Sequence, residues 1–187
     1  MVTSRTLRTR ERILAVALDL FERQGYRATT VAQIADAAGV TSMTFFRHFP
    51  TKDAVLVSDP YDPLIAEAVA AQPLGLPALE RVRLGFLTAL DGITPTEDAT
   101  ARRRVAIATG LPELRGALAA STQATHDAIV DRLVGQGVDR LEAAVTTGAC
   151  LGGVTAALLA WPAMPPEVTL GAVVRHALDQ LKIGGNR

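Results

Sequence analysis

The 187-residue chain has little of what defines several large classes of protein. A single cysteine, Cys150, excludes a disulfide framework within one chain and fits a reducing cytoplasm. Aromatic residues make up only 4% of the chain, no segment shows the two-residue period of a strand, and no internal repeat is visible. The start, MVTSRTLRTR, lacks an apolar stretch, so no signal peptide is evident. Abundant alanine and 49% hydrophobic residues favour closely packed helices in one or two domains.

The sequence also lacks the short motifs that mark common catalytic and metal sites. It has no phosphate-cradling glycine loop, no HExxH or paired-cysteine spacing and no Gly-x-Ser-x-Gly elbow. The three histidines, His48, His126 and His176, are scattered along the chain without a neighbouring pattern typical of catalysis or zinc binding. We therefore expect a protein that is not an enzyme and that has no catalytic residues, no metal site and no cofactor.

Acidic and basic side chains balance, with 19 of each, but they are unevenly distributed. Residues 1–53 carry eight basic and five acidic side chains, a net charge of +3, and the remainder carries −3. A neutral protein with a basic end suits one anionic partner docking at that end. Four arginines near the N-terminus have two open readings: a solvated, partly disordered tail, or an arm that grips phosphates or the minor groove. They are Arg5, Arg8, Arg10 and Arg12.

The segment TTVAQIADAAGVTSMTFFRHFPTK, residues 29–52, predicts two short helices joined at Gly39. Thr30 and Gln33 form a capping box at the start of the first helix, and apolar residues then recur at i, i+3, i+4 and i+7. Gly39 is free to take the left-handed conformation that ends a helix, and Thr41 caps the next one. This order indicates a helix-turn-helix DNA reader.

In the second of these helices Phe45 and Phe49 lie one turn apart and are expected to face inward. The outward side carries two adjacent i, i+4 pairs, Ser42 with Phe46 and Met43 with Arg47. Upstream, an amphipathic pattern from Ile13 to Phe21 predicts a further helix that stops at Gly25. Three helices over about fifty residues form a small core, so this part is expected to lean on the rest of the chain.

Residues from about Arg10 to Leu56 resemble the DNA-binding domain of the tetracycline-repressor-like (TetR) family of bacterial regulators. The resemblance lies in the order and spacing of FERQGYRATTV, IADAAGV, T-x-x-T-F-F-R-H-F and P-T-K-D-A-V-L. It implies a set of DNA contacts in which some residues grip phosphates and others face the major groove. The implied phosphate contacts are Thr29, Thr30, Thr44, His48 and Lys52, the implied groove residues are Ser42, Met43 and Arg47, and Thr41 and Phe46 complete the set.

Two positions depart from the family pattern. The family usually has a tyrosine where this chain has Phe46, and the tyrosine hydroxyl commonly contacts a DNA phosphate. Phe46 is therefore expected to pack only against sugar or a thymine methyl group. Met43 stands where a small residue is common, and we expect it to reach base edges through apolar contact only. Arg47 keeps two readings, a phosphate contact and a guanine contact.

Beyond residue 50 the sequence predicts further helices and no strand. They are expected at 51–71, interrupted near Asp59-Pro60 and Asp62-Pro63, and at 78–93, 97–108, 111–134, 139–161 and 167–183. About nine helices in all indicate an all-α chain. We expect two domains: a three-helix helix-turn-helix DNA-binding domain over residues 1–52, and a helical effector-binding and dimerisation domain over residues 53–187.

Residues 143–166 carry no charge, and a segment of this length could span a bilayer. Gly148 and Gly152 also have a spacing known from membrane helix pairs. Three threonines, three glycines, a pair of prolines at the end and the lack of flanking basic clusters favour a buried helix in a soluble dimer instead. We therefore expect no membrane partner.

Each of the last two predicted helices carries an apolar stripe. Two such hairpins related by a twofold axis would form a four-helix bundle, and the family resemblance also implies a homodimer. The alternative is that the stripes pack only within the monomer. Operator symmetry argues against it, because helix-turn-helix dimers read two half-sites about 34–36 Å apart. The expected interface residues are Gly148, Leu151, Val154, Leu170, Val174, Leu178 and Leu181.

The resemblance further implies a pocket for a small-molecule effector among the middle helices, although plain core is the simpler reading of each candidate. The candidates are Phe86, Leu87, Leu90, Arg103, Ile107, Leu111, Leu114, Ile129 and Trp161. The order of RRRVAIATGLPELRGAL, a long helix and a helix ending in Trp161 is similar to a subgroup suggested to bind acyl-coenzyme-A-like ligands. Arg102, Arg103 and Arg104 would then be candidate phosphate partners, although a basic run is usually a solvated helix face.

We therefore expect a cytoplasmic, homodimeric, ligand-responsive repressor, released from a palindromic DNA operator by a small hydrophobic effector. The effector would stabilise a wider spacing of the two readers through the helix after Lys52. Two alternatives stay open: a helical small-molecule binding protein whose basic end is incidental, and an activator instead of a repressor.

Overall fold

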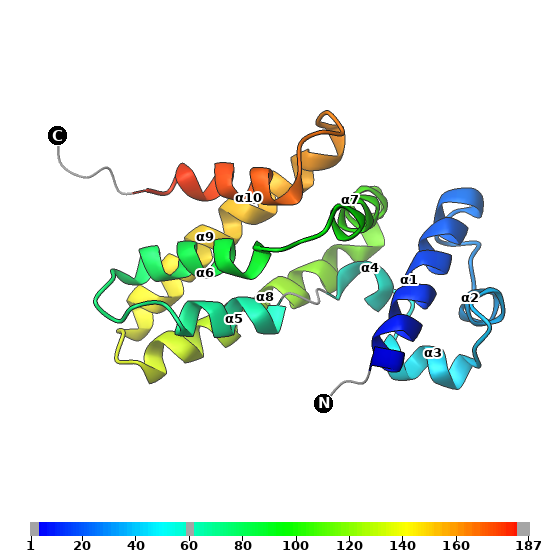
Figure 1. Ribbon diagram of the computed structural model, residues 1–187, viewed down its shortest axis with the longest axis horizontal. Coiled ribbons are helices and arrows are strands. Elements are labelled where there is room, and N and C mark those ends of the chain that lie inside the picture. Colours follow the sequence, from blue (N-terminus) through cyan, green and yellow to red (C-terminus); the bar gives the residue numbers. More distant parts are fainter. Residues whose placement is uncertain (1–3, 59–61, 183–187) are drawn as a thin grey trace. The chain divides into compact units, whose positions relative to one another are not determined.

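Helices make up the regular structure in the computed structural model of the protein, which describes residues 4–58 and 62–182. In these residues ten α-helices and two short 3₁₀ helices follow one another, and there is no strand (Figure 1). The expected all-α fold is confirmed, with ten α-helices where about nine were expected. The chain divides into two compact units. The first unit holds Met1–Ser58 and Arg103–Leu114, and the second unit holds Asp59–Arg102 and Arg115–Arg187.

The first unit takes in a second segment from far along the sequence. Residues 103–114 belong to it, whereas the expected boundary between residues 52 and 53 assigns them to the other domain. This segment is the end of α7 (Pro95–Thr109) together with the 3₁₀ helix η1 (Pro112–Leu114). Ala108 and Leu114 are both buried. The distant segment thus adds apolar surface to a helix-turn-helix core that is small by itself.

Four helices form the N-terminal part of the first unit: α1 (Ser4–Gln24), α2 (Val31–Ala37), α3 (Ser42–His48) and α4 (Ala54–Val57). The predicted capping box is present, because Thr30 Oγ1 accepts from the Gln33 backbone N–H and Gln33 Oε1 accepts from the Thr30 backbone N–H. Gly39, between α2 and α3, has a φ of +62°, which glycine adopts without strain. Thr41 Oγ1 then accepts from the Thr44 backbone N–H and caps α3. Short-range capping therefore sets the turn between the two helices.

Apolar side chains from all four helices close the core of this part. The most deeply buried are Ile13, Ala17, Leu18, Phe21, Ile34, Ala35, Phe45, Phe49, Val55 and Leu56. Phe45 of α3 and Phe49, the C-cap residue of α3, are 0% and 1% exposed, and both face inward as predicted. Their burial fixes which side of α3 faces outward.

Residues 51–71 form two helices where one interrupted helix was expected. The first, α4, ends at Val57, because the backbone of Ser58 is extended (φ −74°, ψ 119°). The expected interruption near Asp59-Pro60 lies outside the described residues. Pro63 belongs to the first turn of α5, where the missing N–H costs little.

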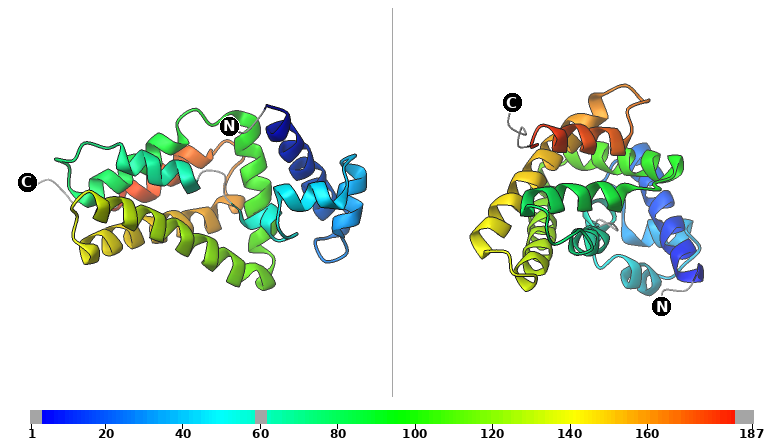
Figure 2. Two further views of the ribbon diagram at one scale, coloured as in Figure 1. Left: turned by 90° about the horizontal axis from the view of Figure 1, so that it is seen from below. Right: turned by 60° about the vertical axis from the view of Figure 1, so that its left-hand side comes forward.

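The second unit is a helical bundle around α6 (Figures 1 and 2). Its helices besides the start of α7 are α5 (Asp62–Ala70), α6 (Ala78–Leu90), α8 (Arg115–Gly135), α9 (Arg140–Ala160), the 3₁₀ helix η2 (Trp161–Ala163) and α10 (Leu170–Asp179). Helix α6 packs against α5, α9 and α10, and α8 packs against α5 and α9. Helices α5 and α6 approach closely at Gly85, where an added Cβ would lie 2.7 Å from the Val69 Cα atom. Only glycine fits this crossing without displacement of the backbone.

Helix α9 buries one side and exposes the other. The buried side consists of Ala143, Thr147, Cys150, Leu151 and Val154. Burial raises the pKa of the Cys150 thiol to about 12, so this cysteine stays protonated and behaves as a small core residue. The exposed side, the apolar stripe of α9, consists of Leu141, Val145, Gly148, Gly152, Ala156 and Leu159.

The segment Arg140–Ala163 is long and apolar enough to cross a membrane, judged by length and composition alone, and 28% of its apolar window is buried. One such helix is weak evidence for a membrane span, because the core helix of a soluble protein passes the same test.

Candidate nucleic-acid interface

The outward face of α3 carries four exposed side chains: Ser42, Met43, Phe46 and Arg47. Met43 is 67% exposed and Phe46 is 48% exposed, which is high for large apolar residues. Phe45, on the inward side, lies with its ring centroid 5.5 Å from that of Phe46, at an interplanar angle of 88°. This edge contact packs the inward side of the Phe46 ring against Phe45 and leaves its outward side exposed to solvent.

Three threonines near the helix starts differ in their access to solvent. Thr30 and Thr41 are exposed caps of α2 and α3, and the hydroxyl of Thr41 also pairs with that of Thr44 at 3.0 Å. Thr29, in contrast, is 1% exposed. Its hydroxyl donates to the carbonyl oxygen of Gly25 at 2.8 Å and accepts from Gln24 Nε2 at 3.1 Å. This hydroxyl holds the turn before α2, and the expected phosphate contact of Thr29 stays a prediction.

Lys52 is also engaged within the first unit. Its Nζ donates to the carbonyl oxygens of Tyr26 at 2.8 Å and Thr29 at 2.9 Å, and it lies 4.1 Å from the centroid of the Tyr26 ring. The neighbouring Asp53 accepts a hydrogen bond from the Tyr26 hydroxyl. Two of the three ammonium protons thus hold the turn before α2 against the segment before α4. Lys52 therefore positions the helix-turn-helix, and its expected phosphate contact stays a prediction that would use the third N–H of the ammonium group.

We expect Lys52→Met to lower the free energy of unfolding by about 2 kcal/mol, because two carbonyls lose a charged donor. Chemical denaturation followed by circular dichroism measures this loss. Arg47→Met is the matched control, since Arg47 is exposed on α3 and its replacement is expected to leave stability unchanged. Equal stability of Lys52→Met and the unaltered protein would contradict the assigned role.

Arg10 fixes the end of α3. Its Nη1 donates to the carbonyl oxygen of His48 at 2.6 Å, and its guanidinium lies 4.2 Å from the centroid of the Phe49 ring. Burial and the charge of Arg10 lower the pKa of His48, so its imidazole is neutral at pH 7 and offers an N–H without a positive charge. Of the four N-terminal arginines, Arg10 is therefore structural, whereas Arg8 and Arg12 are exposed on α1.

Arg103 and Arg104 of α7 bind acceptors within the first unit. Arg103 donates to both carboxylate oxygens of Glu22 at 2.7 Å and to Asp19 at 2.5 Å, and these carboxylates raise its pKa. Arg104 donates to the carbonyl oxygens of Leu56 and Ser58 at the end of α4. Arg103 is thus paired with α1, and its expected effector contact stays a prediction.

A second ion pair holds η1 to the turn before α2. Arg27 Nε lies 2.7 Å from Glu113 Oε1, and the guanidinium lowers the pKa of the Glu113 carboxyl to about 2. The pair is solvent-exposed, so its contribution to stability is small.

Arg102, the last residue of α7 in the second unit, is enclosed by backbone carbonyls. Its guanidinium donates to the corner between α9 and α10 and lies 5.4 Å from the centroid of the Trp161 ring. The accepting carbonyls are those of Trp161, Met164, Pro165, Pro166 and Val168. Asp98, one turn earlier, accepts from the Leu170 backbone N–H at the start of α10. All three arginines expected to face phosphates are thus held by acceptors of the chain itself.

The nine residues expected to line an effector pocket do not come together within one unit. Arg103, Ile107, Leu111 and Leu114 belong to the first unit, and Phe86, Leu87, Leu90, Ile129 and Trp161 belong to the second. Phe86, Ile129 and Trp161 are at most 3% exposed and serve as core. None of the nine lines the apolar groove between α9 and α10.

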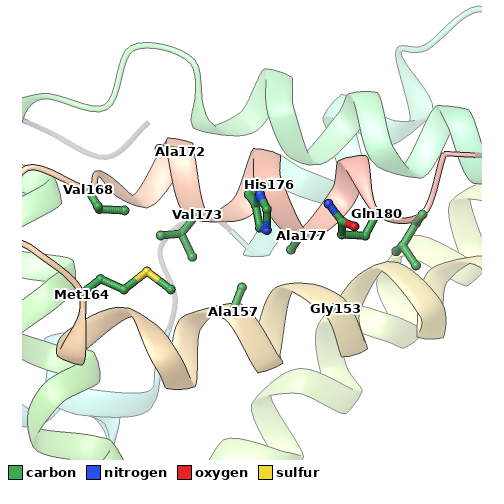
Figure 3. A pocket seen from close by; sticks show the side chains of 10 residues that line it. Gly153, Ala157, Met164, Val168, Ala172, Val173, His176, Ala177 and Gln180 are labelled. Atoms are coloured by element: carbon green, nitrogen blue, oxygen red, sulfur yellow. The ribbon is translucent and has the colours of Figure 1, made fainter.

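An apolar groove of about 510 Å³ runs between α9 and α10 in the second unit (Figure 3). Ala157 and Met164 lie on one side of it, and Val173, His176 and Ala177 of α10 lie on the other. Gly153, Val168, Ala172, Gln180 and Leu181 complete the lining. Sequence reasoning missed this groove, because it depends on how far apart α9 and α10 lie.

Most residues expected at a dimer interface are buried inside the protomer. Leu151, Val154, Leu170, Val174 and Leu178 are all at most 8% exposed. They fill the contacts of α9 and α10 with each other and with α6. These five side chains thus pack within the protomer, whereas Gly148 is exposed and Leu181 lines the groove, and the interface itself stays a prediction.

Comparison with known families identifies both parts of the chain. Residues 13–58 match the family described as "Bacterial regulatory proteins, tetR family", and residues 76–186 match the "MftR C-terminal domain". The transcriptional regulator TcmR of Streptomyces glaucescens is 39% identical over 98 residues, which are 46% of this chain and 43% of TcmR. The transcriptional repressor KstR2 of Rhodococcus jostii is 45% identical over 47 residues, 25% of this chain and 23% of KstR2. The matched segments thus span less than half the length of these relatives.

Solved structures share the whole fold. The TetR-family repressor FadR of Thermus thermophilus, in complex with lauroyl-CoA, has a TM-score of 0.54 and 26% identity over 95% of this chain and 96% of FadR. SmeT, the efflux-pump repressor of Stenotrophomonas maltophilia, has a TM-score of 0.58 and 21% identity over 91% of this chain and 87% of SmeT, a likeness of fold alone. With one family model matching the reader and another matching most of the remainder, the chain belongs to the TetR family of bacterial transcriptional regulators.

Proposed function

We propose that the protein is a cytoplasmic, homodimeric repressor of transcription that binds a palindromic operator and leaves it when a small apolar effector binds. The exposed face of α3 carries the DNA-binding part of the proposal. Ser42 to Arg47 present polar, apolar and cationic groups on a helix whose other side is locked into the core by Phe45 and Phe49. A rigid helix with an uncovered face of mixed chemistry is what readout of the major groove requires.

Selection of bound fragments from a random DNA pool tests this part. We expect a palindromic consensus, and an affinity that falls roughly 10³- to 10⁵-fold between 50 and 200 mM salt if six to ten phosphates are contacted. Arg47→Ala is expected to change the selected base at one position if Arg47 contacts guanine, and to weaken all sequences equally if it contacts phosphate. Binding without sequence preference or salt dependence would favour the alternative, a small-molecule carrier. Transcription in vitro from the selected operator separates repression from activation.

The proposed dimer face is the apolar stripe of α9 together with the adjoining groove. The stripe leaves large side chains such as Leu141, Val145 and Leu159 57–73% exposed. Gly153 of the groove lies three residues before Ala156 of the stripe, so the groove adjoins the stripe on the surface of α9. A second copy related by a twofold axis would cover both, and its small residues at Gly148 and Gly152 would allow close helix contact. Such a dimer would present two α3 helices to two half-sites.

The effector part of the proposal concerns the second unit. FadR of Thermus thermophilus was solved with lauroyl-CoA, and SmeT was also solved with triclosan. Arg102, Arg103 and Arg104 are hydrogen-bonded within the chain. We therefore expect the acyl chain of an acyl-CoA-like effector, and not its phosphates, to supply most of the binding free energy. Lauroyl-CoA and lauric acid are expected to raise the melting temperature and to release the operator, whereas coenzyme A is expected to do neither. Stabilisation by coenzyme A alone would contradict this assignment.

Helix α7 would couple effector binding in the second unit to the helix-turn-helix. It is continuous from Pro95 to Thr109, with Arg102 bound to the α9–α10 corner and Arg104 bound to the end of α4. Helix α4 follows the helix-turn-helix directly, so a shift of α7 changes the support of α3. A coupling of about 1–3 kcal/mol would lower operator affinity several-fold or more.

A further inference from the structure

Two large apolar side chains lie together on the outward face of α3. Met43 and Phe46 are three residues apart on the helix, so their side chains are neighbours on its surface. They are 67% and 48% exposed, although burial of either would be favourable. On the DNA-reading helix this exposure indicates a contact that is completed only in a complex.

The polar groups of α3 are arranged around this apolar pair. Thr44 is tied to Thr41 through its backbone N–H and its hydroxyl, and the carbonyl of His48 is taken by Arg10. Ser42 and Arg47, beside the pair, are exposed and provide hydrogen-bond donors. The centre of the reading face is thus apolar, and donors flank it.

In the major groove the thymine C5 methyl is the apolar group among the base edges. We propose that Met43 and Phe46 form a methyl-reading patch that selects thymine in each half-site by its C5 methyl group, an inference that rests on the proposed DNA-binding function. The exposed Arg47 beside the patch and the net charge of +3 over residues 1–53 fit an anionic duplex better than an apolar protein surface. The edge contact with Phe45 holds the ring of Phe46 in place, so this ring would form a fixed wall against the thymine methyl group. The flexible Met43 side chain would pack against the same methyl group from its neighbouring position on α3.

Deoxyuridine substitution in the selected operator tests the patch. Deoxyuridine keeps the base pair and the O4 acceptor of thymine and removes only the methyl group. One or two thymine positions per half-site are expected to lose roughly three- to tenfold in affinity, and the remaining thymines to lose nothing. Two further operators carry cytosine or 5-methylcytosine at such a position in place of thymine. The operator with 5-methylcytosine is expected to bind more tightly than the one with cytosine, because its methyl group restores part of the contact.

The double variant Met43→Ala, Phe46→Ala is expected to bind the thymine and deoxyuridine operators equally. Both side chains are exposed, so thermal unfolding of this variant checks that the fold is intact. Ser42→Ala is the matched control, expected to weaken both operators while it leaves their ratio unchanged. An unchanged thymine-to-deoxyuridine ratio in the double variant, or no thymine that responds to loss of its methyl, would overturn the patch and leave the proposed function standing. Absence of any sequence-specific binding in the selection would overturn both.

Discussion

Gly152→Arg is expected to convert the proposed homodimer into a monomer and to weaken operator binding by roughly 10²- to 10⁴-fold. In a dimer, binding of one protomer to its half-site holds the other protomer close to the second half-site, and a monomer loses this gain in affinity. Gly152 lies in the middle of the apolar stripe of α9, and beyond its chain neighbours and the adjoining backbone of α9 no atom of the described residues lies within 4 Å of a Cβ at this position. The protomer therefore accommodates the longer side chain, and the charge acts only on the surface that a second copy would cover. Sedimentation velocity and operator titration measure the two effects.

Ala128→Arg, at an exposed position of α8, is the matched control and is expected to keep both the dimer and its affinity. Leu178→Glu would be a poor test, because Leu178 is 0% exposed and a buried carboxylate would unfold the second unit. A Gly152→Arg protein that sediments as a dimer would refute the α9 stripe as the interface.

Gly85→Ala is expected to cost about 3 kcal/mol in the free energy of unfolding, a large effect for one methyl group. The added Cβ would lie 2.3 Å from Val69 Cγ2 and 2.7 Å from the Val69 Cα and N atoms. A rotamer change relieves the first contact, whereas the other two require α5 and α6 to move apart. Because α6 also packs against α9 and α10, such a movement would disturb the centre of the bundle. Urea denaturation of the purified variant measures the loss.

Gly116→Ala provides the comparison. Gly116 lies in α8, and the methyl group that alanine adds there meets no atom within 4 Å in the part of the chain that the structure describes. The same chemical change is expected there to be neutral or to stabilise by up to about 1 kcal/mol, because alanine favours the helix. Equal stability of the two variants would show that the α5–α6 crossing adjusts without cost.

The turn between α2 and α3 followed from the sequence because its determinants are local. Thr30 and Gln33 cap each other three residues apart, Gly39 reverses the chain, and Thr41 starts the next helix. Each contact joins residues so close in sequence that no distant segment decides it. The inward position of Phe45 followed in the same way from the period of the helix.

The partners of long charged side chains could not be predicted in this way. Lys52 bonds the carbonyls of Tyr26 and Thr29, and Arg103 reaches Asp19 and Glu22, more than eighty residues earlier. The sequence around a basic residue does not indicate which distant acceptor its side chain will bind. Family resemblance suggested phosphate for both, and the fold supplies acceptors within the chain that the sequence did not indicate.

The all-helical fold, the order of the helices and the helix-turn-helix could be predicted from the sequence, because capping and apolar periodicity act over a few residues. The side of α9 that is buried was decided only by tertiary packing. From residue 143 onward that helix carries no charge, so periodicity gave no clear reason to bury Leu151 and Val154 and to expose Val145 and Gly152. Contact with α6, α8 and α10 decided which side is buried, and the candidate partner surface shares only Gly148 with the α9 residues that the sequence had suggested.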